Sequence, residues 1–187
     1  MGNPTELLAR WKSGDESALA PLIDQLYEQL RSVAVQQLRR QWSNARLQPT
    51  ELVNEAFIKV QHLHHIDWQD RLHFIAVVSK VMRQVLTDQY RRENAHKREH
   101  ERITLATAHL DDEQDQVYEF GHLITALEEF ADVSAELAEI VELRFFGGMT
   151  HKEIATLKGS SERTVKRQWR LARAWLQDRL AHDLERG

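Results

Sequence analysis

Apolar residues recur at every third or fourth position along most of the chain, which is the spacing of amphipathic helices. In the first half, this pattern predicts two helices within residues 5–42, a third that starts at Pro49 and a fourth over about residues 72–92. Proline suits the first position of a helix because its φ angle is already helical and its nitrogen has no hydrogen to donate. The clearest apolar stripe lies in the second helix and comprises Ala18, Leu22, Leu26, Leu30, Val33 and Leu38. These stripes indicate a small helical bundle.

Residues 139–176 form three short helical runs that are separated by two sharp breaks. Gly147 and Gly148 end the first run, as glycine commonly does at the C-terminus of a helix. Thr150 lies three residues before Glu153, and this spacing is the signature of a capping box at the start of the second run. The breaks and caps therefore predict three helices in quick succession.

A tight turn over residues 158–161 leads to the third run, which has an apolar and a basic face. The apolar face comprises Val165, Trp169, Ala172 and Leu176. Two helices joined in this way are typical of a helix-turn-helix, whose second helix reads the major groove. From Lys158 to Arg179 the chain has seven Lys and Arg against two acidic residues, although its overall net charge is −4. Such a local basic face favours DNA binding over the alternative, an ordinary solvated helix face.

The composition narrows the class of protein. Seven Gly and three Pro among 187 residues favour helix, and the absence of Cys excludes disulfides, thiolate metal sites and a cysteine nucleophile. The sequence has no Gly-rich phosphate loop, HExxH motif or nucleophile elbow, so we expect neither an enzyme nor a cofactor. The histidine cluster at residues 62–65 has no second spaced ligand pair, and we expect no metal site there. Because we find neither a membrane-spanning apolar run nor a signal-peptide pattern, we expect a soluble cytoplasmic protein without membrane insertion.

A polar and charged stretch separates two helical regions. Residues 96–118 read as a linker, with one domain over residues 5–95 and a second over residues 119–184. From residue 111 to residue 142 the chain has eleven Asp and Glu and no Lys or Arg. We interpret this acidic block as a solvated face. The alternative hypothesis is that it keeps the C-terminal domain from non-specific DNA contacts.

Four segments, in this order, resemble parts of a bacterial RNA polymerase sigma factor of the extracytoplasmic-function (ECF) group. LLARWKSGDESAL resembles the start of the sigma-2 domain, and TELVNEAFIKV resembles its core-binding helix. LHFIAVVSKVMRQVLTDQYRR resembles the helix that faces the −10 promoter element, and SERTVKRQWRLARAWL the −35-reading helix of sigma-4. The resemblance implies an all-α fold, with a sigma-2 helical bundle and a sigma-4 helix-turn-helix joined by the linker. It also implies an alternative sigma factor, which directs core polymerase to specific promoters and starts transcription.

The resemblance further implies partners and contact residues. Sigma-2 binds the β′ clamp helices of the polymerase in this family, sigma-4 binds the β flap, and promoter DNA is the other partner. The implied core-polymerase contacts are Gln48, Thr50, Glu51, Asn54 and Glu55. The implied −10 contacts are Trp68, by stacking on an unstacked base, and Lys80, Arg83, Gln84, Arg91 and Arg92. The implied −35 contacts are Ser160, Ser161, Arg163, Thr164, Lys166, Arg167 and Arg170.

The start of the core-binding helix departs from the family pattern. The family usually has an acidic D-A-E-D cluster there, whereas this chain has Gln48, Pro49, Thr50 and Glu51. Two of the three acids are missing, and we expect weaker charge-assisted contacts to basic residues of β′. A phosphate on Thr50 would restore about −1.5 to −2 charge at a helix N-terminus, which favours anions. The chain thus resembles the subgroup of these sigma factors that a Ser/Thr protein kinase activates.

Alternatives stay open at this point. In the first alternative for Thr50, its phosphorylated form pairs with Arg46 of the same molecule. In the second, Thr50 is only an exposed residue, and Glu51 and Glu55 suffice for core binding. For the whole chain, the alternatives are an ordinary helix-turn-helix regulator that binds DNA without polymerase, and a helical adaptor that binds no DNA. An anti-sigma factor is a further partner that the resemblance leaves open.

Overall fold

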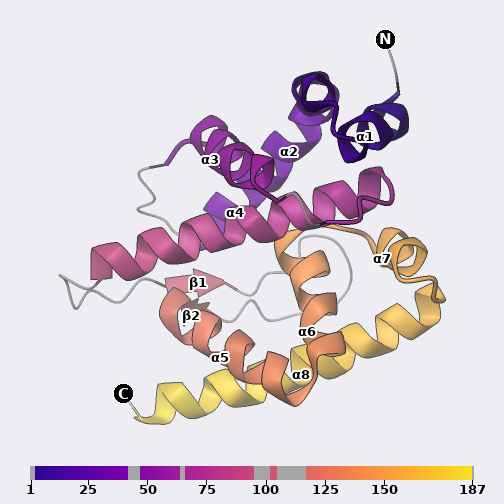
Figure 1. Ribbon diagram of the computed structural model, residues 1–187. Coiled ribbons are helices and arrows are strands. Elements are labelled where there is room, and N and C mark those ends of the chain that lie inside the picture. Colours follow the sequence, from indigo (N-terminus) through magenta and orange to yellow (C-terminus); the bar gives the residue numbers. More distant parts are fainter. Residues whose placement is uncertain (1–2, 42–46, 64–65, 95–101, 105–116, 187) are drawn as a thin grey trace.

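The N-terminal half of the chain forms four α-helices in a computed structural model, which describes residues 3–41, 47–63, 66–94, 102–104 and 117–186. These helices are α1 (Pro4–Lys12), α2 (Leu19–Gln41), α3 (Pro49–Gln61) and α4 (Arg71–Asn94), with a 3₁₀ turn, η1 (Glu16–Ala18), between the first two. Figure 1 shows α1, α2 and α3 on one side of α4, which runs across the middle of the molecule. The predicted bundle of four helices is therefore confirmed.

The predicted apolar stripes form the core of this half. Leu22 of α2, Leu52 of α3 and Phe74 and Met82 of α4 are fully buried. Pro49 is the first residue of α3, and the backbone N–H of Gln48 donates to Glu51 Oε2 at 2.6 Å. Proline and this hydrogen bond together fix the residue at which α3 starts. Burial of its apolar side leaves the other side of the helix exposed.

Two short strands occur in and at the end of the predicted linker, residues 96–118. β1 (Arg102–Thr104) pairs antiparallel with β2 (Val117–Glu119), with Ile103 opposite Tyr118, and β1 lies against α2. Strands of three residues are too short to show a clear alternation of apolar and polar positions, which is why the sequence pattern did not indicate them. The other linker positions, 96–101 and 105–116, lie outside the described residues.

The C-terminal half contains the predicted helix-turn-helix. Its elements are α5 (Phe120–Val133), α6 (Ala135–Val141), the π-helical turn η2 (Glu142–Phe146), α7 (His151–Leu157) and α8 (Glu162–Arg186). The predicted capping box is confirmed, because Glu153 N–H donates to Thr150 Oγ1 at 3.2 Å and Thr150 N–H donates to Glu153 Oε2 at 2.8 Å. Gly148 and Gly159 have φ angles of 64° and 59°, a left-handed conformation that glycine adopts without strain. Both breaks thus follow from the residues that the sequence supplies.

The turn η2 changes the course of the chain between α6 and α7. The N–H of Gly147 donates to the carbonyl oxygen of Glu142 at 2.8 Å, five residues back, which is the spacing of a π-helix. The sequence pattern suggested one continuous helical run here. The wider turn ends that run and directs the chain toward α4.

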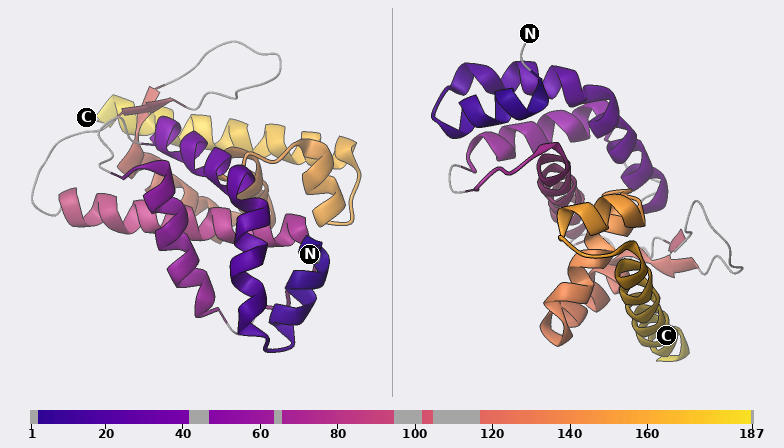
Figure 2. Two further views of the ribbon diagram at one scale, coloured as in Figure 1. Left: turned by 90° about the horizontal axis from the view of Figure 1, so that it is seen from above. Right: turned by 90° about the vertical axis from the view of Figure 1, so that its right-hand side faces the viewer.

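The two halves pack against each other. η2 contacts both α2 and α4, and α7 contacts α4. A single apolar core includes residues of both halves, so the α4 helix has buried positions on more than one side. Figure 2 shows this arrangement from two further directions. The fold is all-α apart from the two short strands, and none of the described helices has the length and apolar character of a membrane span.

Candidate nucleic-acid and protein interfaces

Helix α8 presents a basic face to solvent. Ser161 caps its start, because Thr164 N–H donates to Ser161 Oγ at 3.1 Å. Val165 and Trp169 are buried against the rest of the C-terminal half, which fixes the rotation of the helix about its axis. The predicted contacts on the opposite side are exposed, namely Ser160, Ser161, Arg163, Lys166, Arg167 and Arg170, whereas Thr164 is half-buried. The structure thus brings the predicted −35 residues together on one surface.

Two charged residues, Glu162 and Lys152, lie beside the basic face of α8. Lys166 pairs with Glu162 one turn earlier, at 2.8 Å between Nζ and Oε1. The hydrogen bond from Lys166 is the largest cause of a lowered pKa at Glu162, and Lys152 of α7 also contributes. Lys152 is an exposed cation beside this face and is not among the predicted −35 contacts. Its position in the first turn of the first helix of a helix-turn-helix could have pointed to it, because in this motif the first helix crosses the DNA backbone.

Helix α3 carries a second exposed face, on the N-terminal half. The predicted contacts Gln48, Thr50, Glu51, Asn54 and Glu55 are all exposed, while Leu52, Val53, Ala56 and Val60 are buried. The same exposed side includes Ile58, whose exposed fraction of 52% is unusual for a large apolar side chain. Ile58 was not predicted, although it follows Asn54 and Glu55 by one helical turn, and this spacing was the signal.

Thr50 is the second residue of α3 and is exposed to solvent. Its hydroxyl group makes no hydrogen bond with another described residue. As the second residue of α3, Thr50 lies within the first turn of the helix. Unpaired backbone N–H groups and the helix dipole favour a negative charge there. Arg46, the alternative partner for a phosphate on Thr50, lies outside the described residues.

The predicted −10 residues on α4 fall into two environments. Lys80 and Gln84 are exposed, and so is Arg92, whose Nε donates to the carbonyl oxygen of Asp88 at 3.2 Å. Arg83 and Arg91 instead form ion pairs with acidic residues of the C-terminal half. Arg83 Nε lies 2.8 Å from Glu142 Oε2, and Arg91 Nη2 lies 2.7 Å from Glu128 Oε1.

Trp68 does not have the exposed position expected for a residue that stacks on a base. Its exposed fraction is 6%, and its ring stacks on Trp11 with 5.0 Å between centroids. It also lies 5.3 Å from the ring of Phe74, so it joins the loop before α4 to α1 and to the core. A large indole gains more free energy from this burial than from solvent exposure. This position corrects the sequence-based expectation, which assumed a loop side chain open to solvent.

The described residues contain no group of three or more His, Asp or Glu side chains with the arrangement of a metal site. Within the histidine cluster noted in the sequence, residues 64 and 65 lie outside the described part of the chain.

A sequence model of a known protein family, the ECF sigma factor, matches residues 1–182. This chain belongs to the ECF sigma factor family. The match covers both halves, including the exposed face of α3 and the basic face of α8. The comparison with curated proteins gave no match. ECF sigma factors are transcription initiation factors, and the family implies core RNA polymerase and promoter DNA as partners.

Proposed function

We propose that this sigma factor binds core polymerase through the exposed face of α3, and that phosphorylation of Thr50 by a Ser/Thr protein kinase activates the binding. The observation that carries the proposal is the position of Thr50, exposed and in the first turn of α3. A kinase needs an accessible hydroxyl group, and Thr50 provides one on the side of the helix that also bears Glu51 and Glu55.

The charge of this face supports the proposal. Gln48, Pro49 and Thr50 have no charge, and the carboxylate of Glu51 already accepts the hydrogen bond from the Gln48 N–H. A phosphate adds about −1.5 to −2 charge and three acceptor oxygens in a turn that favours anions. Basic residues of a partner would then meet two adjacent anionic groups instead of one.

The expected gain is large enough for a switch. Charge-assisted hydrogen bonds each contribute roughly 1.5–3 kcal/mol. A net gain of about 3 kcal/mol tightens binding by roughly two orders of magnitude. The carboxylates of Glu51 and Glu55 alone leave the unmodified protein in the weakly binding state.

Two further contacts complete the proposed role. The exposed face of α8, with Arg163, Lys166, Arg167 and Arg170, reads the −35 duplex, and Ser160 and Ser161 contact phosphates. Helix α4 contacts −10 DNA through Lys80, Arg83, Gln84, Arg91 and Arg92. An α4 that carries basic side chains along its length suits the phosphate backbone.

The decisive experiment measures binding of core polymerase to the full-length protein in four forms: unmodified, phosphorylated at Thr50, phosphorylated at Thr5, and Thr50→Ala. Thr5 is the matched control, because it is exposed and is also the second residue of a helix that starts with Pro-Thr-Glu. We expect roughly 100-fold tighter binding only after phosphorylation of Thr50. Equal tight binding by all forms would remove the switch and keep the sigma function. Binding to palindromic DNA with no affinity for polymerase would favour an ordinary regulator.

A further inference from the structure

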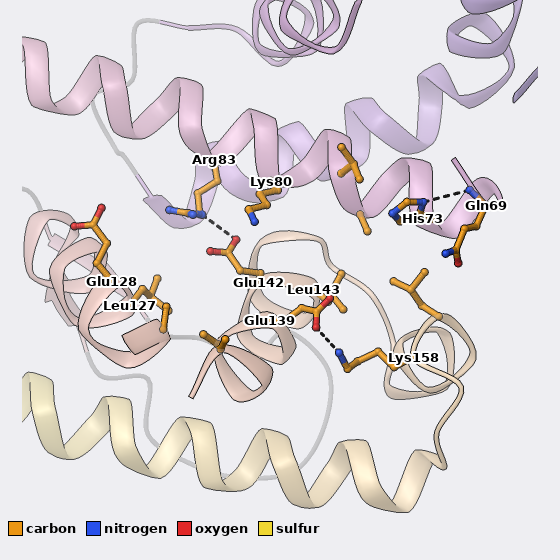
Figure 3. A pocket seen from close by; sticks show the side chains of 16 residues that line it. Gln69, His73, Lys80, Arg83, Leu127, Glu128, Glu139, Glu142, Leu143 and Lys158 are labelled. Atoms are coloured by element: carbon orange, nitrogen blue, oxygen red, sulfur yellow. Dashed lines mark hydrogen bonds and ion pairs between the residues drawn. The ribbon is translucent and has the colours of Figure 1, made fainter. Parts of the chain in front are cut away.

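A cleft of about 570 Å³, lined by both charged and apolar side chains, lies between α4 and the C-terminal half. Figure 3 shows Lys80 and Arg83 extending from α4 toward Glu142 of η2, and Glu139 of α6 paired with Lys158. Lys80 and Arg83 are two of the residues proposed to bind −10 DNA. In this conformation their side of α4 is therefore directed at acidic residues of the same chain.

Arg83 is held more tightly than the other basic residues of α4. Its Nε lies 2.8 Å from Glu142 Oε2, and only 14% of the Arg83 side chain and 18% of the Glu142 side chain are exposed. The guanidinium carbon also lies 5.4 Å from the centre of the Phe146 ring, a cation–π contact. Lys80 contributes a second favourable charge near Glu142. The Nε atom of Arg83 is thus already paired, and most of its side chain is covered by the same chain.

A buried amide strengthens the same contact. Gln37 of α2 is fully buried, and its Nε2 donates to the carbonyl oxygens of both Ser79 in α4, at 2.9 Å, and Phe146 in η2, at 3.0 Å. Gly147 allows the close approach, since a Cβ there would lie 3.2 Å from Ser79 Oγ. One side chain therefore ties α2, α4 and η2 together at the end of the π-helical turn.

We propose that this contact is an autoinhibitory latch, in which Glu142 occupies on Arg83 the position that a promoter phosphate takes when α4 binds DNA. The inference rests on the proposed function, because it takes Arg83 and Lys80 as DNA contacts. A carboxylate and a phosphate bind the same guanidinium group, so they compete for it. Opening of the latch turns the −10 side of α4 to solvent while the exposed faces of α3 and α8 stay as they are.

The physical properties of the latch suit reversible opening. Burial raises the pKa of Glu142, although Arg83 and Lys80 act in the opposite direction. Taking the two charges out of water costs free energy that their attraction offsets only in part, so hydration of both side chains favours opening. The apolar core and the Gln37 hydrogen bonds that join the halves favour the closed state. A DNA phosphate that binds Arg83 only in the open state shifts such an equilibrium readily.

The first test measures opening without any reference to function. The chain has no Cys, so spin labels attached at Gln61→Cys in α3 and Ala174→Cys in α8 report the distance between the two halves. We expect one narrow distance distribution for the parent and an added, longer population for Glu142→Gln and, more strongly, for Glu142→Lys, which puts a third cation beside Arg83 and Lys80. The matched control is Glu128→Gln, because its pair with Arg91 also joins α4 to the C-terminal half but is 57% and 56% exposed. An unchanged distribution in Glu142→Lys would overturn the latch.

A charge swap separates opening from misfolding. The double variant Arg83→Glu with Glu142→Arg restores the attraction with reversed sign, and we expect it to return the short distance. A swapped variant that stays as open as Glu142→Lys would show that pairing does not hold the halves together, and would also overturn the proposal.

The second test measures promoter binding by the complex of core polymerase with the Thr50-phosphorylated protein. We expect Glu142→Gln to bind a promoter fragment roughly tenfold more tightly than the parent, and Glu128→Gln to bind like the parent. Opening without a gain in DNA affinity would refute Glu142 as a competitor of DNA. If no form binds polymerase, the proposed function and the DNA-competition role both fail, while the distance measurements still report whether the contact is a latch between the two halves.

Discussion

Helices α1 and α3 begin with the same four residues, Pro-Thr-Glu-Leu, but they differ in their N-terminal caps and in the residues of their exposed faces. At α1, the side chain of Asn3 accepts a hydrogen bond from Glu6 N–H at 3.0 Å, and Asn3 N–H donates to Glu6 Oε2 at 3.1 Å. At α3, the corresponding cap residue is Gln48. Asparagine is among the strongest N-cap residues and glutamine is not, so α1 has the better structural cap.

The residues that follow on each helix make the larger difference. The polar residues of α1 include Arg10 and Lys12, which pair with Asp15 and Asp67. The exposed face of α3 instead continues with Asn54, Glu55 and Ile58, an acidic and apolar surface. A Pro-Thr-Glu-Leu start does not by itself define a docking site. The rest of the helix face decides whether a phosphate there is read by a partner.

The largest effect is expected from supplying the missing charge without a kinase. Replacement of residues 48–51 by Asp-Ala-Glu-Asp, the usual family cluster, should tighten binding of the unphosphorylated protein to core polymerase roughly 100-fold. The same replacement of residues 3–6 should leave the affinity unchanged, because α1 lacks the acidic face of α3. Fluorescence anisotropy of labelled protein titrated with polymerase measures both. Similar gains at the two sites would indicate a general electrostatic effect rather than a docking face on α3.

A smaller effect is expected from the glutamate that follows Thr in both helix starts, Glu6 in α1 and Glu51 in α3. In the Thr50-phosphorylated protein, Glu51→Gln should weaken polymerase binding roughly tenfold, since it removes one of two adjacent anions from the contact. Glu6→Gln removes the equivalent charge from α1 and should not change the affinity. The same titration gives both values, and circular dichroism checks that each helix is retained. A loss of affinity in Glu6→Gln as large as that in Glu51→Gln would contradict the assignment of the face to α3.

The difference between the caps should appear in stability rather than in binding. Asn3→Ala should lower the free energy of unfolding by about 1 kcal/mol, because it removes a good N-cap. Gln48→Ala should lower it by only a few tenths of 1 kcal/mol, since glutamine is a weak cap residue. Urea denaturation followed by circular dichroism measures both changes. A larger loss for Gln48→Ala would reverse the ranking of the two helix starts.

The smallest effect concerns pH. The second pKa of a phosphate is about 6, so phosphorylated Thr50 has close to two charges above that pH and one below it. Binding of the Thr50-phosphorylated protein to polymerase should therefore weaken about threefold as the pH falls from about 7.5 to about 5.5. The variant with Asp-Ala-Glu-Asp at residues 48–51 is the control, because the ordinary pKa of its carboxylates is about 4 and their charge is constant over this range. An equal decline in both would assign the pH effect to polymerase.

Local signals in the sequence predicted local structure well. The Thr150 capping box, the glycines that end helices and the buried positions of α8 all depend on residues within one or two turns of each other. They also led to the exposed faces of α3 and α8, because burial of one side of an amphipathic helix fixes the direction of the other.

Contacts between distant residues were not predictable in the same way. The pair of Arg83 with Glu142 joins positions 59 residues apart, and no periodicity in the sequence connects them. The burial of Trp68 was also not predictable, because its stacking on Trp11 depends on how α1 meets the start of α4. Both cases concern residues proposed from the family to contact DNA, and both depend on tertiary packing rather than on local propensity.

The π-helical turn η2 has a consequence for how sequences of this chain's relatives vary in length. A π turn holds one more residue than the α-helical turn it replaces, and each residue of an α-helix corresponds to a rotation of about 100°. Deletion of a single residue between Glu142 and Phe146 would therefore rotate the residues that follow directly relative to α6, and would displace the contacts that η2 makes with α2 and α4. We expect relatives that keep the same arrangement of α4 and α8 to show substitutions in this segment but neither insertions nor deletions.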